Sequence, residues 1–168
     1  LHWGSCAEVP GFGFLLNDEM DDFTTADAPN AYGLVQSDRN RPEPGKRPLS
    51  SMSPTIVLID GQPVAIAGAS GGPRIISGTL QVLLSALVFG DDAAAAVARP
   101  RLHHQWQPNE VRVETHWAHG ETLDGLRDRG HKVVWYENPV GVVQAIIVND
   151  GRITAASDPR KGGRPAGR

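Results

Sequence analysis

The sequence has only one cysteine, no long apolar run and no strong excess of charge of either sign. The single thiol, Cys6, excludes a disulfide within the chain, and no stretch approaches the roughly 20 apolar residues of a membrane-spanning helix. Nineteen acidic and sixteen basic side chains leave a net charge of -3, which argues against nucleic-acid binding because nucleic-acid-binding proteins concentrate positive charge. These absences predict a soluble protein without a membrane span.

The chain also lacks an initiator methionine and any signal peptide at its start, Leu1-His2-Trp3-Gly4. We therefore expect that processing or truncation has removed an upstream segment. The length of 168 residues, 40% of them hydrophobic, suffices for one core of ordinary size. We expect residues 1–168 to form a single domain.

Glycine and proline divide the chain into two parts. Residues 7–48 are rich in both, which predicts a long loop that is either functional or disordered. The remainder is expected to contain a hairpin over 55–60 and 63–67, joined by an Asp-Gly step, and helices over 74–89, 92–98 and 122–129. Strands are expected over 111–114, 131–136, 142–148 and 152–156, and a second Asp-Gly step joins the last two as a hairpin. Apolar residues at helical spacing predict that the first helix is buried. The irregular mixture of elements favours antiparallel sheets covered by helices, an α+β fold.

Two polar segments are candidates for ligand binding. Residues 13–23 contain four carboxylates beside apolar side chains: Asp18, Glu19, Asp21 and Asp22. Crowded carboxylates in a partly dry site favour a cation, such as a substrate ammonium. Residues 45–54 contain the hydroxyls of Ser50 and Ser51, which can donate hydrogen bonds to a carboxylate. Taken alone, each segment could equally be a solvated polar turn.

A third candidate lies between a predicted strand and a predicted helix. Gly71 and Gly72 can turn sharply and present their N–H groups to a ligand, and the start of the helix adds positive potential. Such a turn can hold an oxyanion, although it could also be a simple connection. Together the three segments suggest a ligand with an ammonium, a carboxylate and a reacting oxygen, as in an α-amino acid acyl donor. No nucleophile is evident.

The histidines give a weaker signal. His103-His104 and His116-x-x-His119 have the spacing of metal ligands, but no His-Glu-x-x-His helix and no neighbouring cysteine support a metal site. Packing and hydrogen bonding are the expected roles. We predict neither a metal nor a cofactor.

Five segments resemble, in order, motifs of the small subunit of the gamma-glutamyltranspeptidase family: residues 13–23, 46–55, 70–75, 101–106 and 157–160. The resemblance covers nearly the whole chain. It implies an N-terminal-nucleophile hydrolase with a four-layer αββα sandwich fold, made as a precursor that cleaves itself into a large and a small subunit. The implied nucleophile is the N-terminal threonine of the small subunit, with its own amino group as the base. That threonine is expected upstream of Leu1 and is absent from these residues.

The resemblance also implies roles for individual residues. Glu19 and Asp22 resemble the groups that hold the α-ammonium of the gamma-glutamyl moiety. Ser50 and Ser51 resemble those that hold its α-carboxylate, with an arginine of the large subunit. Gly71 and Gly72 resemble the oxyanion-hole pair, and Tyr32 resembles the tyrosine of a lid, here expected over residues 23–48. Two positions depart from the family: Cys6 replaces a usual glycine, and Ser70 replaces a frequent proline.

The implied partners are the large subunit, glutathione or another gamma-glutamyl donor, and water, an amino acid or a peptide as acceptor. The family also implies a periplasmic or secreted location. Three alternatives stay open: a cephalosporin acylase, a poly-gamma-glutamate depolymerase, and an inactive amino-acid-binding fragment. The intact ammonium and carboxylate segments argue against the acylase, whose acyl group lacks the α-amino acid.

Overall fold

The computed structural model describes residues 2–25, 29–34, 37–117 and 120–167. They form two compact units, Leu1–Ser50 and Ser51–Arg168. The single domain expected for residues 1–168 stays a prediction. The lid expected over 23–48 also stays a prediction, and residues 26–28 and 35–36 of it lie outside the described residues.

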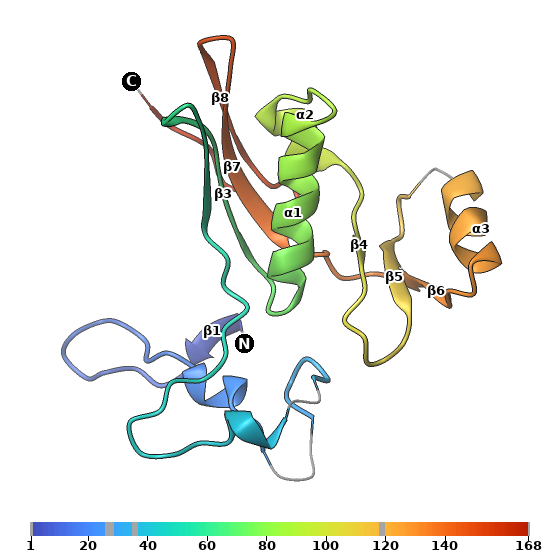
Figure 1. Ribbon diagram of the computed structural model, residues 1–168. Helices are drawn as coiled ribbons and strands as arrows, with labels where there is room; N and C mark the ends of the chain where they lie inside the picture. Colours follow the sequence, from blue (N-terminus) through green and yellow to red (C-terminus); the bar gives the residue numbers. More distant parts are fainter. Residues whose placement is uncertain (1, 26–28, 35–36, 118–119, 168) are drawn as a thin grey trace. The chain divides into compact units, whose positions relative to one another are not determined.

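The first unit consists mainly of loops, as its glycine and proline content predicts. Its regular elements are β1 (His2–Ser5) and two short 3₁₀ helices, η1 (Glu19–Asp22) and η2 (Asp38–Asn40) (Figure 1). The amide of Leu16 donates to the carbonyl of Ala7 at 2.8 Å, and the amide of Val9 donates to that of Phe14 at 3.0 Å. These bonds close a loop that leads directly into η1.

The second unit contains a four-stranded antiparallel sheet in the order β2-β3-β7-β8. Its strands are β2 (Thr55–Ile59), β3 (Gln62–Ser70), β7 (Val142–Asn149) and β8 (Arg152–Ser157). Both predicted hairpins are confirmed. Asp60 and Gly61 have φ of 50° and 77°, and Asp150 and Gly151 have φ of 49° and 75°. Such pairs of positive φ match the twist of the strands that they join.

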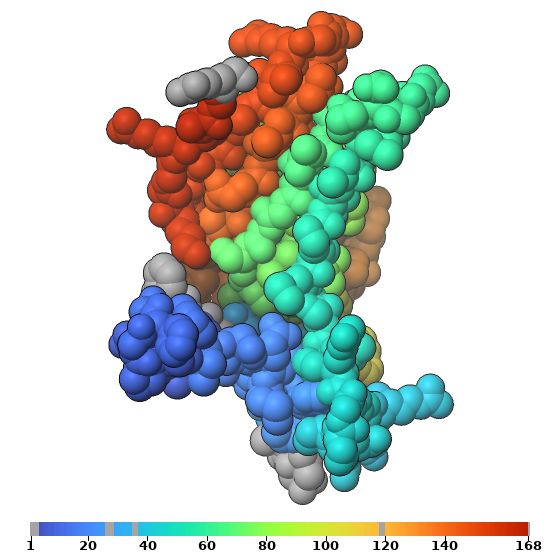
Figure 2. Space-filling model, turned by 90° about the vertical axis from the view of Figure 1, so that its left-hand side faces the viewer, coloured from blue at the N-terminus to red at the C-terminus, as the bar shows by residue number. Residues whose placement is uncertain are grey.

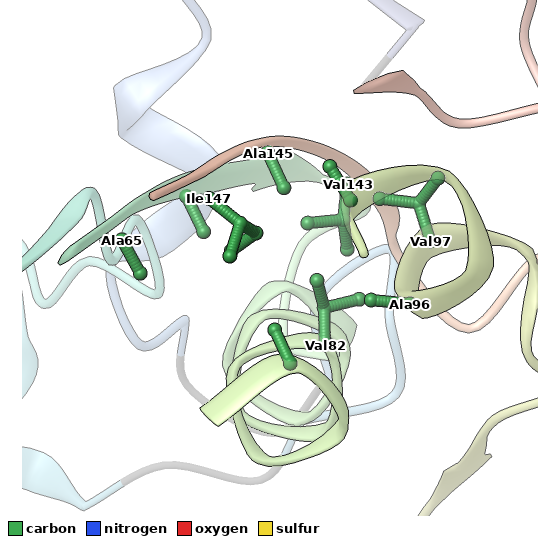
Figure 3. Packing of buried hydrophobic residues seen from close by; sticks show 10 residues of the cluster. Ala65, Val82, Ala96, Val97, Val143, Ala145 and Ile147 are labelled. Atoms are coloured by element: carbon green, nitrogen blue, oxygen red, sulfur yellow. The ribbon is translucent and has the colours of Figure 1, made fainter. Parts of the chain in front are cut away.

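Helices α1 (Arg74–Leu87) and α2 (Ala93–Ala98) cover one face of this sheet (Figure 1). The core between the sheet and the two helices contains small side chains. Figure 3 shows Ala65 and Ala145 on the sheet face that is covered by the helices, with Val82 of α1 and Val97 of α2 in the same cluster. The buried residues of α1 are Ile75, Gly78, Thr79, Val82, Ser85 and Ala86. Small residues on both surfaces let the helix approach the sheet closely.

The expected burial of α1 through its large apolar residues is therefore wrong in this chain. Ile76 is 54% exposed, Leu80 is 55% exposed and Leu84 is 42% exposed. They occupy the side of the helix away from the sheet, because the small residues fit the alanine-rich face better. A helix that is apolar on both sides is typical of the interior of a larger protein.

The opposite face of the four-stranded sheet is also apolar and open. Ile56, Ile66 and Ile146 occupy neighbouring positions in three adjacent strands, and they are 64%, 41% and 40% exposed. Figure 2 views the second unit from the side away from α1, with the green, orange and red segments of β3, β7 and β8 next to one another. Within the described residues, no helix is long and apolar enough to cross a membrane.

A second, three-stranded sheet has the order β4-β5-β6. It contains β4 (Leu102–His103), β5 (Val111–Glu114) and β6 (Val133–Tyr136), with α3 (Gly120–Asp128) between the last two. Strand β4 has no counterpart among the predicted elements. Strands β5 and β6 are parallel, so the expected antiparallel arrangement holds for the larger sheet only. A parallel pair needs a crossover, which α3 supplies.

Four charged side chains form a buried ionic cluster: Arg101, Glu114, Asp158 and Arg160. Arg101 Nη2 lies 2.5 Å from Asp158 Oδ2, and Arg160 Nη2 lies 2.6 Å from Glu114 Oε2. Arg160 also reaches Asp158, with Nη1 3.0 Å from Oδ1. Arg101, Glu114 and Asp158 are at most 2% exposed. Mutual pairing offsets the cost of removing these charges from water.

The ionic cluster also binds the backbone of several segments. Glu114 accepts hydrogen bonds from the amides of Arg101 at 2.8 Å and Val140 at 2.9 Å. Arg101 donates to the carbonyls of Val97, Val140 and Gly141, each at 3.0 Å. The cluster therefore fixes the end of α2 and the segment that enters β7.

Asp158 is held in its charged form. Burial alone would raise the pKa of Asp158, but hydrogen bonds from the amides of Val143 and Arg160 and the charge of Arg101 outweigh burial and lower this pKa. A carboxyl with a lowered pKa in the fold contributes stability above its unfolded pKa, near 3.8. That contribution is lost as the pH falls through the folded pKa.

We predict that Asp158→Asn lowers the free energy of unfolding of the full-length protein by about 3 kcal/mol at neutral pH, because buried guanidinium groups lose their counter-charge. The control Asp124→Asn affects an exposed pair with Arg127, in which the aspartate is 69% exposed, and should cost less than about 0.5 kcal/mol. Denaturant unfolding measures both. The effect of Asp158→Asn should shrink under acidic conditions, and equal costs for the two variants would contradict the assignment.

Candidate functional site

The acidic segment forms η1, which contains Glu19 and Asp22. The amide of Glu19 donates to Asn17 Oδ1 at 3.1 Å where the helix begins. The amide of Phe23 donates to the carbonyl of Met20 at 3.3 Å where the helix ends. Phe23, which follows the helix, is buried, with 6% of its surface exposed. Asp22 therefore directly precedes a buried residue, Phe23.

The titration of Asp22 reflects its surroundings. Burial raises the pKa of Asp22, and the neighbouring carboxylates of Glu19 and Asp21 raise this pKa further. Burial and like charges destabilise the ionised carboxylate, so a cation that binds beside it stabilises it. The arrangement suits the ammonium ligand expected from the sequence.

A buried asparagine joins η1 to the serine segment. Asn40 is 4% exposed; its Nδ2 donates to the carbonyl of Asp22 at 2.7 Å, and its Oδ1 accepts from the amide of Leu49 at 3.0 Å. Because Ser50 follows Leu49, this one side chain brings two of the predicted binding segments together within the first unit. No motif marks Asn40 in the sequence. In a loop without regular elements, few backbone groups pair with one another. The Asn40 side chain forms hydrogen bonds with two of these backbone groups instead.

The two serines lie at the division between the units. Ser50 ends the first unit, and Ser51 begins the second. Ser50 is exposed and Ser51 is half-buried. Four residues after Ser51, Thr55 begins β2, and its Oγ1 donates to the carbonyl of Ser53 at 3.0 Å. The hydroxyl groups thus precede a strand, as predicted.

The Gly71–Gly72 turn connects β3 to α1, also as predicted. Gly71 has a φ of 137° and Gly72 a φ of 60°. Residues other than glycine rarely adopt such positive φ values. The carbonyl of Gly72 accepts from the amide of Ile75 at 3.0 Å, so the turn continues directly into the helix. The N-terminal end of α1 favours negative charge at this point.

The turn lies directly against another glycine. A Cβ atom on Gly71 would lie 3.2 Å from the Cα of Gly141, and one on Gly141 would lie 2.9 Å from the carbonyl oxygen of Arg74. The ionic cluster holds Gly141 in turn, because Arg101 donates to its carbonyl. The predicted oxyanion turn is therefore supported by backbone that is itself fixed.

Tyr32 lies in a small turn organised by Asn30. Asn30 Oδ1 accepts from the amides of Tyr32 at 3.0 Å and Leu34 at 3.1 Å, and the Asn30 carbonyl accepts from the amide of Gly33 at 2.8 Å. An asparagine that bonds the following backbone is a common way to fix a turn. The role of Tyr32 as a lid residue stays a prediction.

The histidine pair takes part in local hydrogen bonding. His103 is buried; its Nδ1 lies 2.8 Å from Ser77 Oγ and its Nε2 lies 3.0 Å from Gln105 Oε1. Burial lowers the pKa of His103. His119 of the second histidine pattern lies outside the described residues. Among the described residues, no group of three or more potential ligands could hold a metal ion.

The chain is similar in sequence to glutathione hydrolases. The family model described as gamma-glutamyltranspeptidase matches residues 1–168. The glutathione hydrolase proenzyme of Escherichia coli (strain K12) is 47% identical over 150 residues, covering 88% of this chain and 26% of that protein. The corresponding proenzyme of Pseudomonas sp. (strain A14) is 41% identical, covering 99% and 28%. The chain thus spans about a quarter of the length of these two relatives.

Solved structures show the same relationship. A mutant gamma-glutamyltranspeptidase of Helicobacter pylori has a TM-score of 0.85 and 43% identity, covering 94% of this chain and 87% of that chain. The enzyme of Pseudomonas nitroreducens complexed with L-DON has a TM-score of 0.83 and 42% identity, covering 99% and 87%. A cephalosporin acylase of Bacillus halodurans has a TM-score of 0.75 and 26% identity, covering 94% and 28%.

We predict that Gly71→Ala destabilises the full-length protein more than Gly61→Ala. Both glycines have positive φ, 137° and 77°, so each alanine is strained by roughly 1–2 kcal/mol. A Cβ at Gly61 meets nothing within 4 Å, whereas one at Gly71 meets the backbone of Gly141. Thermal unfolding compares the two variants. Equal losses in Tm would mean that the turn can move away from Gly141 at no cost.

Proposed function

Since the chain belongs to the gamma-glutamyltranspeptidase family, a family of enzymes, we propose that the protein containing it hydrolyses and transfers the gamma-glutamyl group of glutathione and other gamma-glutamyl amides. Such a donor carries an α-ammonium, an α-carboxylate and a reacting γ-carbonyl. The observation that carries the proposal is the pair of hydrogen bonds in which Asn40 donates to the carbonyl of Asp22 and accepts from the amide of Leu49. Through them, the carboxylates of η1 and the hydroxyl of Ser50 lie in one unit, which suits a ligand with the two charged groups of an α-amino acid.

The α-ammonium binds at η1. Glu19 and Asp22 supply its negative partners, and the raised pKa of Asp22 supports this role, because a bound cation offsets the repulsion within the loop. Each hydrogen bond to a charged group is worth about 1.5–3 kcal/mol. The crowding of carboxylates thus becomes favourable only when the donor is present.

The α-carboxylate binds at the serine segment. Ser50 and Ser51 donate their hydroxyls to it, and an arginine of the large subunit supplies the positive charge. The serine hydroxyls fix the orientation of the carboxylate, and the guanidinium supplies most of the electrostatic attraction to it. With both ends of the amino acid held, only the γ-carbonyl is free to react.

The reaction takes place at the Gly71–Gly72 turn. The hydroxyl of an N-terminal threonine outside residues 1–168 attacks the γ-carbonyl carbon, and its proton passes to the threonine's own amino group. The amides of Gly71 and Gly72 stabilise the negative oxygen of the tetrahedral intermediate. The C–N bond then breaks, the leaving amine takes the proton, and an ester remains on the threonine. Water or an acceptor amine resolves this ester and restores the hydroxyl.

The large subunit of the same self-cleaving precursor is the proposed partner. The open sheet face, which carries Ile66 and Ile146, and the outer side of α1, which carries Leu80 and Leu84, are both apolar and exposed. Covering apolar surface contributes about 25 cal/mol per Å². These faces support a second sheet over the first and further helices beyond α1. That arrangement is the four-layer αββα sandwich of N-terminal-nucleophile hydrolases.

The remaining features follow from the same proposal. Tyr32 belongs to a lid over a small, enclosed donor, which favours glutathione over the polymer that a poly-gamma-glutamate depolymerase accepts. A cephalosporin acylase shares the fold, but its acyl group has no α-amino acid for the carboxylates and serines to bind. An inactive amino-acid-binding fragment would keep these segments without turnover. The chemistry needs no cofactor, and the family favours the periplasm or the cell exterior.

We predict that Asp22→Asn in the complete two-subunit protein lowers kcat/KM for a gamma-glutamyl anilide by roughly 10- to 100-fold, because one charge-assisted hydrogen bond is lost. Asp21→Asn is the control, since Asp21 belongs to the same helix and has no proposed contact with the donor. In the parent, kcat/KM should also fall as the pH drops through the raised pKa of Asp22, and Asp22→Asn should abolish this dependence.

A glutaryl anilide separates binding from folding, because it is the same donor without the ammonium. Asp22→Asn should leave turnover of this analogue nearly unchanged. If Asp22→Asn reduced turnover of both donors by the same factor, Asp22 would support the loop and the ammonium assignment would be wrong. A complete protein that turned over neither donor would refute the proposed function itself.

A further inference from the structure

Arg74 contacts the Gly71–Gly72 turn in a way that the proposed chemistry leaves unused. Arg74 is the first residue of α1, and its Nε donates to the carbonyl oxygen of Gly71 at 3.1 Å. In a trans peptide, the carbonyl of one residue and the N–H of the next point in opposite directions. Holding the oxygen of Gly71 therefore sets the direction of the N–H of Gly72.

We propose that Arg74 is a positioning residue that keeps the Gly71–Gly72 peptide oriented so that the N–H of Gly72 faces the reacting γ-carbonyl oxygen. This inference rests on the proposed function of the turn. Glycine populates positive and negative φ almost equally, so a peptide between two glycines resists rotation less than any other. Rotation would replace a donor with a carbonyl oxygen, and that oxygen would repel the oxyanion instead of stabilising it.

Tyr136 of β6 holds the Arg74 side chain. Arg74 Nη1 donates to the hydroxyl of Tyr136, and the Arg74 guanidinium carbon lies 5.5 Å from the centre of the Tyr136 ring. The side chain is half-buried, so these contacts are partly shielded from water. Arg74 thus links the turn to the second sheet. Its two contacts use different nitrogen atoms, Nε for Gly71 and Nη1 for Tyr136, so both can be made at once.

Arg112 offers a matched control on the same ring. Its guanidinium carbon lies 5.3 Å from the centre of the Tyr136 ring, and its Nε donates to Glu110 Oε1 at 3.1 Å. It therefore resembles Arg74 in charge and in its contact with the aromatic ring. It has no hydrogen bond to the turn among those of the described residues. Substitution of Arg112 removes a nearby positive charge without releasing the Gly71 carbonyl.

The test compares Arg74→Met, Tyr136→Phe and Arg112→Met in the complete two-subunit protein. The kcat is expressed per molecule of protein that has cleaved itself into its two subunits. Loss of an oxyanion donor lowers kcat by about 10²–10³-fold, and a donor that is only misoriented should lose less. We expect Arg74→Met to lower kcat for a gamma-glutamyl anilide by about tenfold or more, with KM changed less than about twofold. Tyr136→Phe should show the same pattern more weakly. Arg112→Met should retain the parent kcat.

A second readout identifies the oxyanion directly. A glutamate analogue with a phosphonate at the γ-position carries a tetrahedral, negative oxygen group where the intermediate would form. Arg74→Met should weaken its binding by the same factor as kcat, because both depend on the N–H of Gly72. Binding of glutamate itself, which is planar at that carbon, should change little.

Several outcomes would overturn the proposal. A rise in KM with kcat unchanged would mean that Arg74 binds the donor, and an unchanged kcat would mean that the turn needs no such support. If Arg74→Met did not fold, Tyr136→Phe would decide, since it keeps the ring and removes only the hydroxyl; an unchanged kcat there would count against the proposal. If the parent protein itself did not turn over the anilide, the proposed function would fail, whatever the variants did.

Discussion

The buried ionic cluster is the interaction on which the second unit depends. Its four side chains come from three segments of the sequence, because Asp158 and Arg160 lie close together in the chain, and they pair with one another and with backbone groups instead of water. Arg101 reaches the carbonyls of Val140 and Gly141, and Gly141 lies against both Gly71 and Gly78. A set of charges far from the solvent therefore determines the position of the strand-to-helix turn. Removing one charge leaves at least one buried partner with fewer counter-charges, so the members of the cluster depend on one another.

Most of the secondary structure follows from local patterns. Two hairpins were predicted from their Asp-Gly steps, and α1 was predicted to cover 74–89 and covers Arg74–Leu87. The buried side of α1 was not predictable. Hydrophobic periodicity identifies a helix, but α1 has apolar residues on two sides, and periodicity does not show which side packs against the four-stranded sheet. The short β4 contains only two residues, and the parallel pairing of β5 with β6 depends on contacts between distant segments. Neither leaves a local signal.

The candidate site was predictable where function demands an unusual composition. The carboxylates near Asp22, the paired serines and the glycine turn each stand out in the sequence. Asn40 and Arg74 do not, because a single asparagine in a loop and a single arginine at a helix start are ordinary residues. Their importance lies in which backbone atoms they contact, and those contacts form only when the chain folds. Cys6 shows the reverse case: its φ of 58° is a conformation that glycine adopts more readily, in keeping with the glycine that the family resemblance implies for this position.

We propose that this chain contributes the groups that bind a gamma-glutamyl donor. The most direct measurement is a structure of the complete two-subunit protein with a gamma-glutamyl group trapped as the ester on the nucleophile. We expect the α-ammonium within hydrogen-bonding distance of Asp22, the α-carboxylate at Ser50 and Ser51, and the γ-carbonyl oxygen facing the amides of Gly71 and Gly72. A trapped group with its ammonium away from η1, or its carbonyl oxygen away from the glycine turn, would contradict the account.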